Sequence, residues 1–313
     1  MNKVLKFIGY SIVTILAGLG LLIIIIGDKD IPREQLKTKY AKSPSTFIPV
    51  MGMQVHYRDE GNKEDTTPLL LIHGTSSSLN TWDSLVKLMP SHKRIIRLDM
   101  PAFGLTGPNP ENEYSYQYYS QFLYAFLKEL NIKQCIVAGN SLGRGIAWHF
   151  ALAYPKQVHQ LILIDASGYP KLNEKGSLGF TLARIPIINN LLLFVTPKIL
   201  VKKSLEDAFA DKRLVTEERI TRYHDLLLAE GNRRAALSIF KNELEQESEK
   251  IKDIQQPTLI IFGEKDQLIN SQYAYLFQKD IIGSIAFVLP GVGHVPMEEA
   301  PLETAKIMND FIK

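Results

Sequence analysis

Short runs of apolar residues recur along this chain, and between them lie longer segments with helical spacing. A strand that is apolar on both faces must be covered on both sides, as in a parallel sheet between two layers of helices. The runs are Leu69–Ile72, Ile95–Leu98, Gln134–Ala138, Leu161–Ile164, Thr258–Phe262 and Ile285–Leu289. The helical segments are Tyr114–Leu130, Leu142–Tyr154 and Pro296–Phe311. We therefore expect an α/β fold with a mostly parallel sheet, preceded by a hairpin of Phe47–Val50 and Gln54–Asp59 around Gly52.

The alternation of strands and helices is interrupted once. After Gly168, residues 171–252 show helical patterns and no convincing strand, and the strand pattern resumes after Pro257. The simplest organisation is therefore one α/β domain, made of residues 46–170 and 253–313, that carries residues 171–252 as a helical insertion.

The amino terminus departs most from an average composition. No charged residue occurs in Phe7–Ile26, and a helix of about 20 apolar residues can cross the hydrocarbon core of a bilayer. We therefore expect residues 1–27 to be a single-pass membrane anchor. The protein would then be located at the membrane and would have the membrane as a partner. Residues 28–45 are charged and contain two prolines, which predicts a tether. A cleaved signal peptide that begins with Lys3 and Lys6 is the alternative, and basic residues on both sides leave the orientation undecided.

Composition and charge narrow the functional classes. The chain of 313 residues has a formal net charge of +3 and no basic run with interleaved aromatics, so nucleic-acid binding is not expected. Cys135 is the single cysteine, which excludes an intramolecular disulfide and a cysteine-rich metal site. It lies in an apolar run and is expected to be a buried strand residue. Nothing in the sequence indicates an obligatory protein partner.

The segment Gly139-Asn140-Ser141-Leu142-Gly143 matches the pattern G-x-S-x-G. It falls between an expected strand and an expected helix, which is the context that this motif needs. The tight turn presents the serine hydroxyl above the sheet, and the glycines let the neighbouring backbone approach closely. The amino terminus of the following helix adds positive potential and N–H groups for a developing oxyanion. Ser141 is therefore predicted to be a nucleophile.

A serine hydroxyl needs a base, and His294 has the required placement among the seven histidines. It lies in Gly291–Pro296, after the last expected strand and before the last helix. A loop in this position returns to the sheet edge that carries Ser141. We therefore predict that His294 is the general base.

An acid should hold the imidazole in the right tautomer and stabilise its cation. Asp266 follows the strand Thr258–Phe262, and this gives the order Ser, Asp, His along the chain. Asp266 is therefore the predicted acid. Two other carboxylates are alternatives, namely Asp165 at the end of the strand Leu161–Ile164 and Glu264 in the same turn as Asp266.

The turn His73-Gly74-Thr75 follows the first strand of the expected core. A glycine turn at this place exposes backbone N–H groups. The N–H groups of Thr75 and Leu142 are predicted to form an oxyanion hole beside the nucleophile.

Five segments, taken in chain order, resemble the motifs of the α/β-hydrolase superfamily. They are His-Gly-Thr (73–75), Asp-Met-Pro-Ala-Phe-Gly (99–104), Gly-Asn-Ser-Leu-Gly (139–143), Gly-Glu-Lys-Asp (263–266) and Gly-Val-Gly-His-Val-Pro (291–296). The resemblance covers residue 46 to the end, apart from the insertion. It is to the branch that holds small esterases, monoacylglycerol-lipase-like enzymes and carbon–carbon bond hydrolases. This resemblance implies the α/β-hydrolase fold, a helical cap formed by residues 171–252, and no cofactor.

Three positions refine this resemblance. We call the tight turn that carries Ser141 the elbow. Haloalkane dehalogenases and epoxide hydrolases of the superfamily have an aspartate at this position, and Ser141 argues against both activities. Relatives usually have a second glycine after the elbow glycine, where this chain has Arg144. A cation in the first turn opposes the helix dipole, and its bulk raises the expectation of a crowded approach to Ser141. The turn Pro101–Gly104 has Ala102 where relatives have glycine, which is a milder change.

The expected reaction is acyl transfer in two steps on a small or lipid-like carboxylic ester, through an acyl-enzyme on Ser141. The apolar residues of Leu178–Val201 predict either the core of the cap or an apolar entrance for acyl chains. A carbon–carbon bond hydrolase or a perhydrolase with the same triad is the alternative among enzymes. A ligand-binding protein without catalytic activity, blocked by Arg144, is the alternative from another class.

Overall fold

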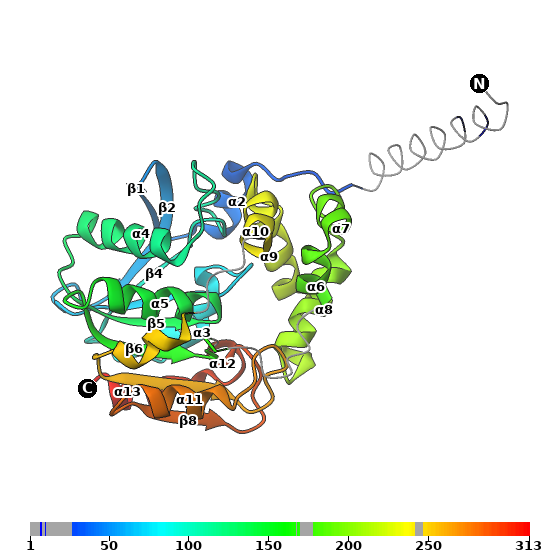
Figure 1. Ribbon diagram of the computed structural model, residues 1–313. Coiled ribbons are helices and arrows are strands. Elements are labelled where there is room, and N and C mark those ends of the chain that lie inside the picture. Colours follow the sequence, from blue (N-terminus) through cyan, green and yellow to red (C-terminus); the bar gives the residue numbers. More distant parts are fainter. Residues whose placement is uncertain (1–6, 8–9, 11–26, 167, 170–177, 242–246) are drawn as a thin grey trace.

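The computed structural model describes residues 7, 10, 27–166, 168–169, 178–241 and 247–313 (Figure 1). Its centre is an eight-stranded sheet in the order β1-β2-β4-β3-β5-β6-β7-β8. The strands are β1 (Ser45–Val50), β2 (Met53–Gly61), β3 (Leu69–Ile72), β4 (Arg94–Leu98), β5 (Cys135–Asn140), β6 (Val158–Ile164), β7 (Thr258–Gly263) and β8 (Ile285–Leu289). The pairs β1–β2 and β2–β4 are antiparallel and all others are parallel. The predicted α/β fold with its opening hairpin is confirmed.

The central strands are buried on both faces, as their apolar sequences require. Along β3 the side chains alternate between two cores, with Leu70 and Ile72 in one and Leu69 and Leu71 in the other. This alternation follows from the period of two in an extended chain. The sheet therefore needs a helical layer on each side.

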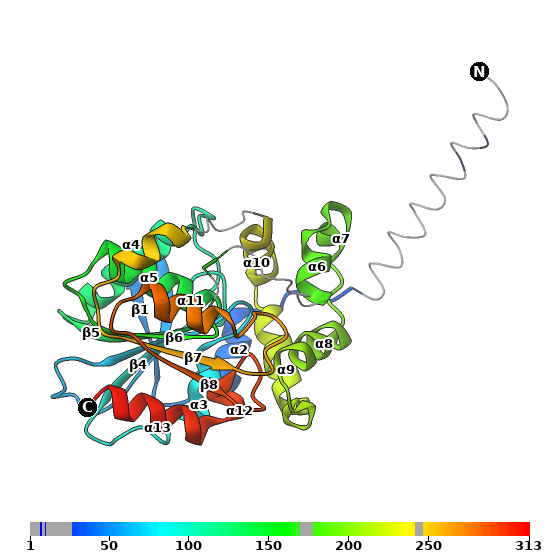
Figure 2. The ribbon, with the colours of Figure 1, turned by 60° about the horizontal axis from the view of Figure 1, so that its bottom comes forward.

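Helices supply both layers, and Figure 2 shows them above and below the strands. The first layer consists of α4 (Tyr116–Glu129), α5 (Leu142–Ala153) and α11 (Tyr273–Asp280). The second consists of α3 (Asp83–Val86), α12 (Pro296–Glu299) and α13 (Pro301–Phe311), with the 3₁₀ turn η1 (Leu79–Trp82) beside them. The closing helix predicted over residues 296–311 is divided at Ala300, which has φ −130° and ψ 60°. Proline disfavours helical backbone at the residue before it, so Pro301 ends one helix and begins the next.

In the region predicted as an insertion, the described residues form helices joined by short turns. It contains α6 (Leu178–Arg184), α7 (Pro186–Leu191), α8 (Lys198–Ala208), η2 (Lys212–Leu214), α9 (Glu217–Leu227) and α10 (Asn232–Lys241), and η3 (Ser248–Asp253) follows. No strand occurs in residues 178–241, which we call the cap. Figure 1 shows the cap to one side of the sheet. The predicted borders at 171 and 252 stay predictions, because residues 170–177 and 242–246 lie outside the described part.

Residues 28–45 contain ordered structure where a simple tether was predicted. Helix α2 (Arg33–Tyr40) buries Leu36. Before it, the Asp28 N–H donates to the Phe194 carbonyl at 2.8 Å, and the Ile31 N–H donates to the Leu228 carbonyl at 2.8 Å. The partners of these two backbone hydrogen bonds lie 166 and 197 residues further along the chain, which local composition does not reveal.

The prediction of a membrane location is contradicted. Within the part of the chain that the structure describes, no helix has both the length and the apolar character to cross a bilayer. Anchoring to a membrane through residues 1–27 is likewise not supported by the described residues. A span requires a continuous helix as well as apolar composition, and of Phe7–Ile26 only residues 7 and 10 are described.

Candidate active site

Ser141 occupies the turn between β5 and α5, as the motif predicted. Its backbone has φ 55° and ψ −118°, a region that residues with a side chain rarely adopt and that commonly marks functional turns. The motif glycines are required for space. A Cβ on Gly143 would lie 2.3 Å from the carbonyl oxygen of Ile72, and one on Gly139 would lie 2.3 Å from the carbonyl oxygen of Gly143. The elbow therefore packs directly on the end of β3.

His294 and Asp266 form a close pair. His294 Nδ1 lies 2.7 Å from Asp266 Oδ2, and the side chains are 7% and 0% exposed. The other carboxylate oxygen of Asp266 accepts from the N–H groups of Leu268 at 2.8 Å and Ile269 at 3.0 Å. Both oxygens are therefore engaged, which holds the imidazole with Nε2 turned away from the carboxylate.

Tertiary contacts bring the histidine loop to the elbow. The side-chain amide of Asn140 donates to the His294 carbonyl at 3.0 Å, and the His294 N–H donates to the carbonyl of Ala208 in the cap at 2.7 Å. Ser141 and His294 line the same cavity of about 160 Å³. Among the described residues the Ser141 hydroxyl makes no hydrogen bond to His294, and such bonds often tighten only when substrate binds. Asn140 was not predicted as a site residue, since only its place in the motif marks it.

The residues predicted for an oxyanion hole lie around Ser141. Thr75 lines the cavity, and a Cβ on Gly74 would lie 3.0 Å from the Ser141 Cβ. Leu142 is the first residue of α5, where backbone N–H groups have no partner inside the helix. His73 supports this turn, because its Nδ1 donates to the Gly74 carbonyl at 2.8 Å while its Nε2 accepts from the Met100 N–H at 3.0 Å. Burial lowers the pKa of His73, so its ring is neutral.

Asp165 and Glu264, the alternative acids, have other surroundings. Asp165 is fully buried, and its Oδ1 accepts from the Gly263 N–H at 2.9 Å. Burial, together with the negative charge of Asp266, raises the pKa of Asp165 well above its ordinary value. Asp165 therefore holds its proton more strongly than an ordinary aspartate does. Glu264 is an exposed side chain that accepts from the Gly291 N–H at 3.0 Å.

Asp165 and Asp266 lie close enough to His294 to be compared with the ligand set of a metal ion. Each of Asp165, Asp266 and His294 offers one ligand atom, and these three atoms lie within 4.8 Å of one another. However, the 2.7 Å separation between His294 Nδ1 and Asp266 Oδ2 is shorter than the roughly 3.3 Å that separates two ligands of a tetrahedral ion. The contact has the geometry of a hydrogen bond between the two side chains.

Arg144 contacts the backbone of the turn that carries Ser141. It is buried, and its Nε donates to the Ser141 carbonyl at 3.0 Å. Arg144 is not one of the described residues that line the cavity of Ser141. Its Nε is bound to the turn itself, and the expected crowding of the approach to Ser141 is not seen among the described residues that line the cavity.

A second Ser–His–Asp arrangement occurs at the opening hairpin. Ser45 Oγ lies 2.9 Å from His56 Nε2, and His56 Nδ1 lies 2.7 Å from Asp99 Oδ2. The His56 ring is buried and stacked on Phe47. Asp99 also accepts from the N–H groups of two loop residues, Leu79 and Leu105. None of Ser45, His56 and Asp99 lines the cavity of Ser141, so this arrangement holds loops together without a place for substrate.

The cap covers the cavity and makes its lining mostly apolar. The apolar cap residues in the lining are Ala183, Leu192, Leu200, Val201, Leu205, Ala208, Phe209, Leu227, Ala236, Leu237 and Phe240. A site of this kind suits a ligand with an apolar portion that reaches Ser141 through a few polar groups.

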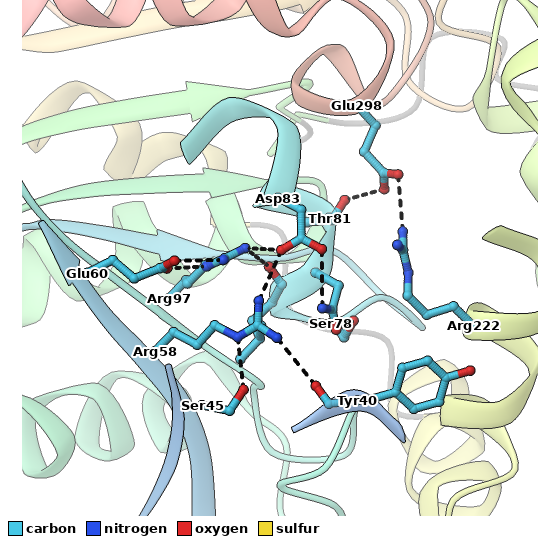
Figure 3. A network of polar contacts seen from close by, with 12 residues as sticks. Tyr40, Ser45, Arg58, Glu60, Ser78, Thr81, Asp83, Arg97, Arg222 and Glu298 are labelled. Atoms are coloured by element: carbon cyan, nitrogen blue, oxygen red, sulfur yellow. Dashed lines mark hydrogen bonds and ion pairs between the residues drawn. The ribbon is translucent and has the colours of Figure 1, made fainter. Parts of the chain in front are cut away.

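Glu298 joins the cap to the core beside this cavity. Its carboxylate accepts from Thr81 Oγ1 at 2.6 Å, from the Tyr223 hydroxyl at 2.7 Å and from Arg219 Nε at 2.8 Å. Figure 3 shows Glu298 between Thr81 and Arg222, whose Nη2 is 3.4 Å away. Burial and the charge of Glu298 raise the pKa of Tyr223, so its hydroxyl stays protonated and donates. Sequence reasoning missed this link, because its parts are far apart along the chain.

Comparisons with known proteins agree with this architecture. The model of the alpha/beta hydrolase family matches residues 69–307. An uncharacterised hydrolase, YugF of Bacillus subtilis, is 29% identical over 274 residues, which covers 87% of this chain and 99% of that protein. Lipase 1 of Psychrobacter immobilis is 28% identical, over 81% of this chain and 79% of the lipase.

A solved structure resembles the fold as well. The meta-cleavage product hydrolase CumD of Pseudomonas fluorescens IP01 superimposes with a TM-score of 0.73 at 23% identity, over 85% of this chain and 97% of CumD. With the elbow, the sheet order and the matched region in agreement, the chain belongs to the alpha/beta hydrolase family.

Proposed function

We propose that this protein is a serine hydrolase that cleaves carboxylic esters through an acyl-enzyme on Ser141. His294 takes the hydroxyl proton through Nε2 as Ser141 attacks the ester carbonyl, and Asp266 stabilises the imidazolium that forms. The N–H groups of Thr75 and Leu142 hold the oxyanion. Protonated by His294, the alcohol leaves, and water activated by the same base releases the acid.

One observation carries this proposal. A strained serine elbow and a histidine fixed at 2.7 Å from a buried carboxylate line a single cavity. A structural histidine pair alone does not need such a cavity, as His56 and Asp99 illustrate. The apolar lining supports an ester with an apolar acyl or alcohol part.

A carbon–carbon bond hydrolase or a perhydrolase would use the same three residues. Similarity to the meta-cleavage product hydrolase, at 23% identity, supports the fold alone. The similarity to a lipase at 28% identity and the mostly apolar cavity favour ester cleavage. Turnover of ring-cleavage diketones without turnover of esters would reverse this order.

The test is hydrolysis of nitrophenyl esters of increasing chain length by the purified protein and by two serine variants. Ser141→Ala is expected to abolish turnover and labelling by a serine-directed organophosphate. Ser45→Ala is the matched control, since it removes a serine that contacts a histidine at 2.9 Å outside the cavity, and it should keep both. Full activity in Ser141→Ala would refute the proposed function.

A further inference from the structure

Arg233 brings a permanent charge to a cavity that is otherwise mostly apolar. It lies on α10, and of the described residues that line the cavity it is the one lysine, arginine, aspartate or glutamate. Its side chain is only 7% exposed. A guanidinium so deeply buried needs partners for its N–H groups, since an unpaired buried donor is costly.

The amino-terminal segment satisfies one edge of this guanidinium. Arg233 Nη2 lies 2.6 Å from Asp30 Oδ1 and donates to the Asp28 carbonyl at 2.7 Å, and Nε lies 3.1 Å from Asp30 Oδ1. Nη1 is different. Although this atom is buried, nothing in the described part of the chain hydrogen-bonds to it. The guanidinium therefore keeps an unused donor in a residue that forms part of the cavity wall.

The charges around Arg233 indicate which kind of acceptor fits. Asp30 already neutralises the guanidinium, and the Asp28 carboxylate lies in the same segment, where it accepts from the Thr196 N–H at 2.7 Å. A substrate carboxylate would be a third anion near one cation, and its desolvation would be poorly compensated. An uncharged oxygen can accept from Nη1 without this repulsion.

We propose that Arg233 is a specificity-determining residue that binds an uncharged acceptor oxygen of the substrate through Nη1. The ligand class is an apolar ester that carries a hydroxyl, ether or second carbonyl oxygen away from the scissile carbonyl. This inference rests on the proposed ester hydrolysis at Ser141, and it deepens it by separating oxygen-bearing esters from plain alkyl esters.

The experiment compares esters that differ by one atom, using the full chain. In one series an oxygen replaces successive methylenes of the acyl chain of a nitrophenyl octanoate, and in the other it replaces a methylene of the alcohol in alkyl octanoates. In one of these series kcat/KM should be about tenfold higher for the best oxygen position than for the all-carbon ester, as expected for a hydrogen bond to a charged donor. Arg233→Met should lose this preference and still cleave the all-carbon ester.

Two variants separate recognition from a structural role. Arg234→Met changes the exposed neighbour on α10 and should keep the preference. Asp30→Asn weakens the ion pair with the same guanidinium and should lower thermal stability while it leaves the oxygen preference in place. Equal losses of stability in Asp30→Asn and Arg233→Met, with no change of preference in either, would show that Arg233 only holds the amino-terminal segment.

Other outcomes also decide the matter. A preference of the wild type for an ester with a terminal carboxylate would overturn the uncharged acceptor. Cleavage of all-carbon esters with no oxygen preference in either series would refute the role of Arg233 alone, and absence of any ester cleavage would refute the proposed function. In that last case, calorimetric binding of the matching alkyl and alkoxyalkyl ketones still tests Arg233, since wild type should bind the oxygenated ketone more tightly and Arg233→Met should not.

Discussion

The side-chain amide of Asn140 donates a 3.0 Å hydrogen bond to the main-chain carbonyl of His294, across 154 residues of sequence. Asn140 is the last residue of β5, and Ser141 follows it directly. This bond therefore sets the position of the proposed base relative to the proposed nucleophile. The bond joins the side chain that directly precedes the nucleophile to the backbone of the base, so it fixes the histidine loop against the end of β5.

Asn140→Ala is expected to lower kcat/KM on nitrophenyl esters about tenfold or more, because small displacements of reacting groups are costly. The substitution leaves the buried His294 carbonyl without its donor, so thermal stability should fall as well. Asn309→Ala is the control, since it removes a 3.3 Å amide-to-carbonyl bond in α13. Equal activity in the two variants would contradict the positioning role of Asn140.

Asp266→Asn and Asp165→Asn should differ strongly in activity. Asp266 contacts His294 Nδ1 at 2.7 Å, and an asparagine there favours the wrong imidazole tautomer, so kcat should fall by about 10³–10⁴-fold. Asp165 has a raised pKa and accepts a hydrogen bond from the Gly263 N–H. Asparagine is neutral and can keep this bond, so the Asp165→Asn variant should stay within about tenfold of wild type. Single-turnover kinetics measure both, and a reversed order would make Asp165 the acid.

The raised pKa of Asp165 predicts a pH dependence of stability. The groups that face Asp165 are Asp266, the Gly263 N–H and the cation of Arg144, and burial outweighs the last two. The folded state keeps a proton that the unfolded chain releases above the ordinary Asp pKa of about 4. The contribution of Asp165 to the free energy of unfolding is therefore fully present below about pH 4. It is lost as the pH rises toward the higher pKa of the folded state.

Asp165→Asn should remove this loss. The measurement is the free energy of unfolding in urea. Between pH 5 and pH 8 its value for the variant should rise by about 1–3 kcal/mol relative to that of wild type. The sign follows because the folded wild type binds more protons than its unfolded chain in that range. A variant that loses stability relative to wild type as the pH rises would mean that Asp165 is ionised in the fold.

Glu298→Gln should weaken the connection between cap and core. The substitution leaves Arg219 and Arg222, which are 2.8 Å and 3.4 Å from the carboxylate, without their anion. We expect the free energy of unfolding to fall by about 1–3 kcal/mol and KM for long-chain esters to rise, because the cap residues that line the cavity shift. Glu303→Gln on the exposed face of α13 is the control and should match wild type in both measurements.

Much of the core could be predicted from local patterns. The runs that became β3 and β7 are apolar at every position, and burial on both faces leaves few folds for such strands. The elbow was equally predictable, since G-x-S-x-G between a strand and a helix specifies the backbone conformation of the turn as well as the residue types in it. Likewise, chain order alone pointed to the close pair of Asp266 and His294.

Other predictions failed where composition was used in place of contacts. Residues 28–45 have the charges and prolines of a tether, yet α2 and its preceding segment pair with the cap through Phe194 and Leu228. The membrane location rested on apolar length alone, and the described part of the chain holds no helix that could span a bilayer. Arg144 was expected at the approach to Ser141, but its Nε donates to the Ser141 carbonyl and the residue is not among the described lining of the cavity.

By itself the sequence determined the strands, the helices and the residue types at the elbow, because periodicity and tight turns act over a few neighbouring residues. Only the tertiary structure decided the partners of Asn140, Arg233 and Glu298. These contacts join positions 154, 203 and 75 residues apart for the bonds to His294, Asp30 and Tyr223. A hydrogen bond depends on distance in space and on burial, and both arise only after the sheet and the cap have packed together.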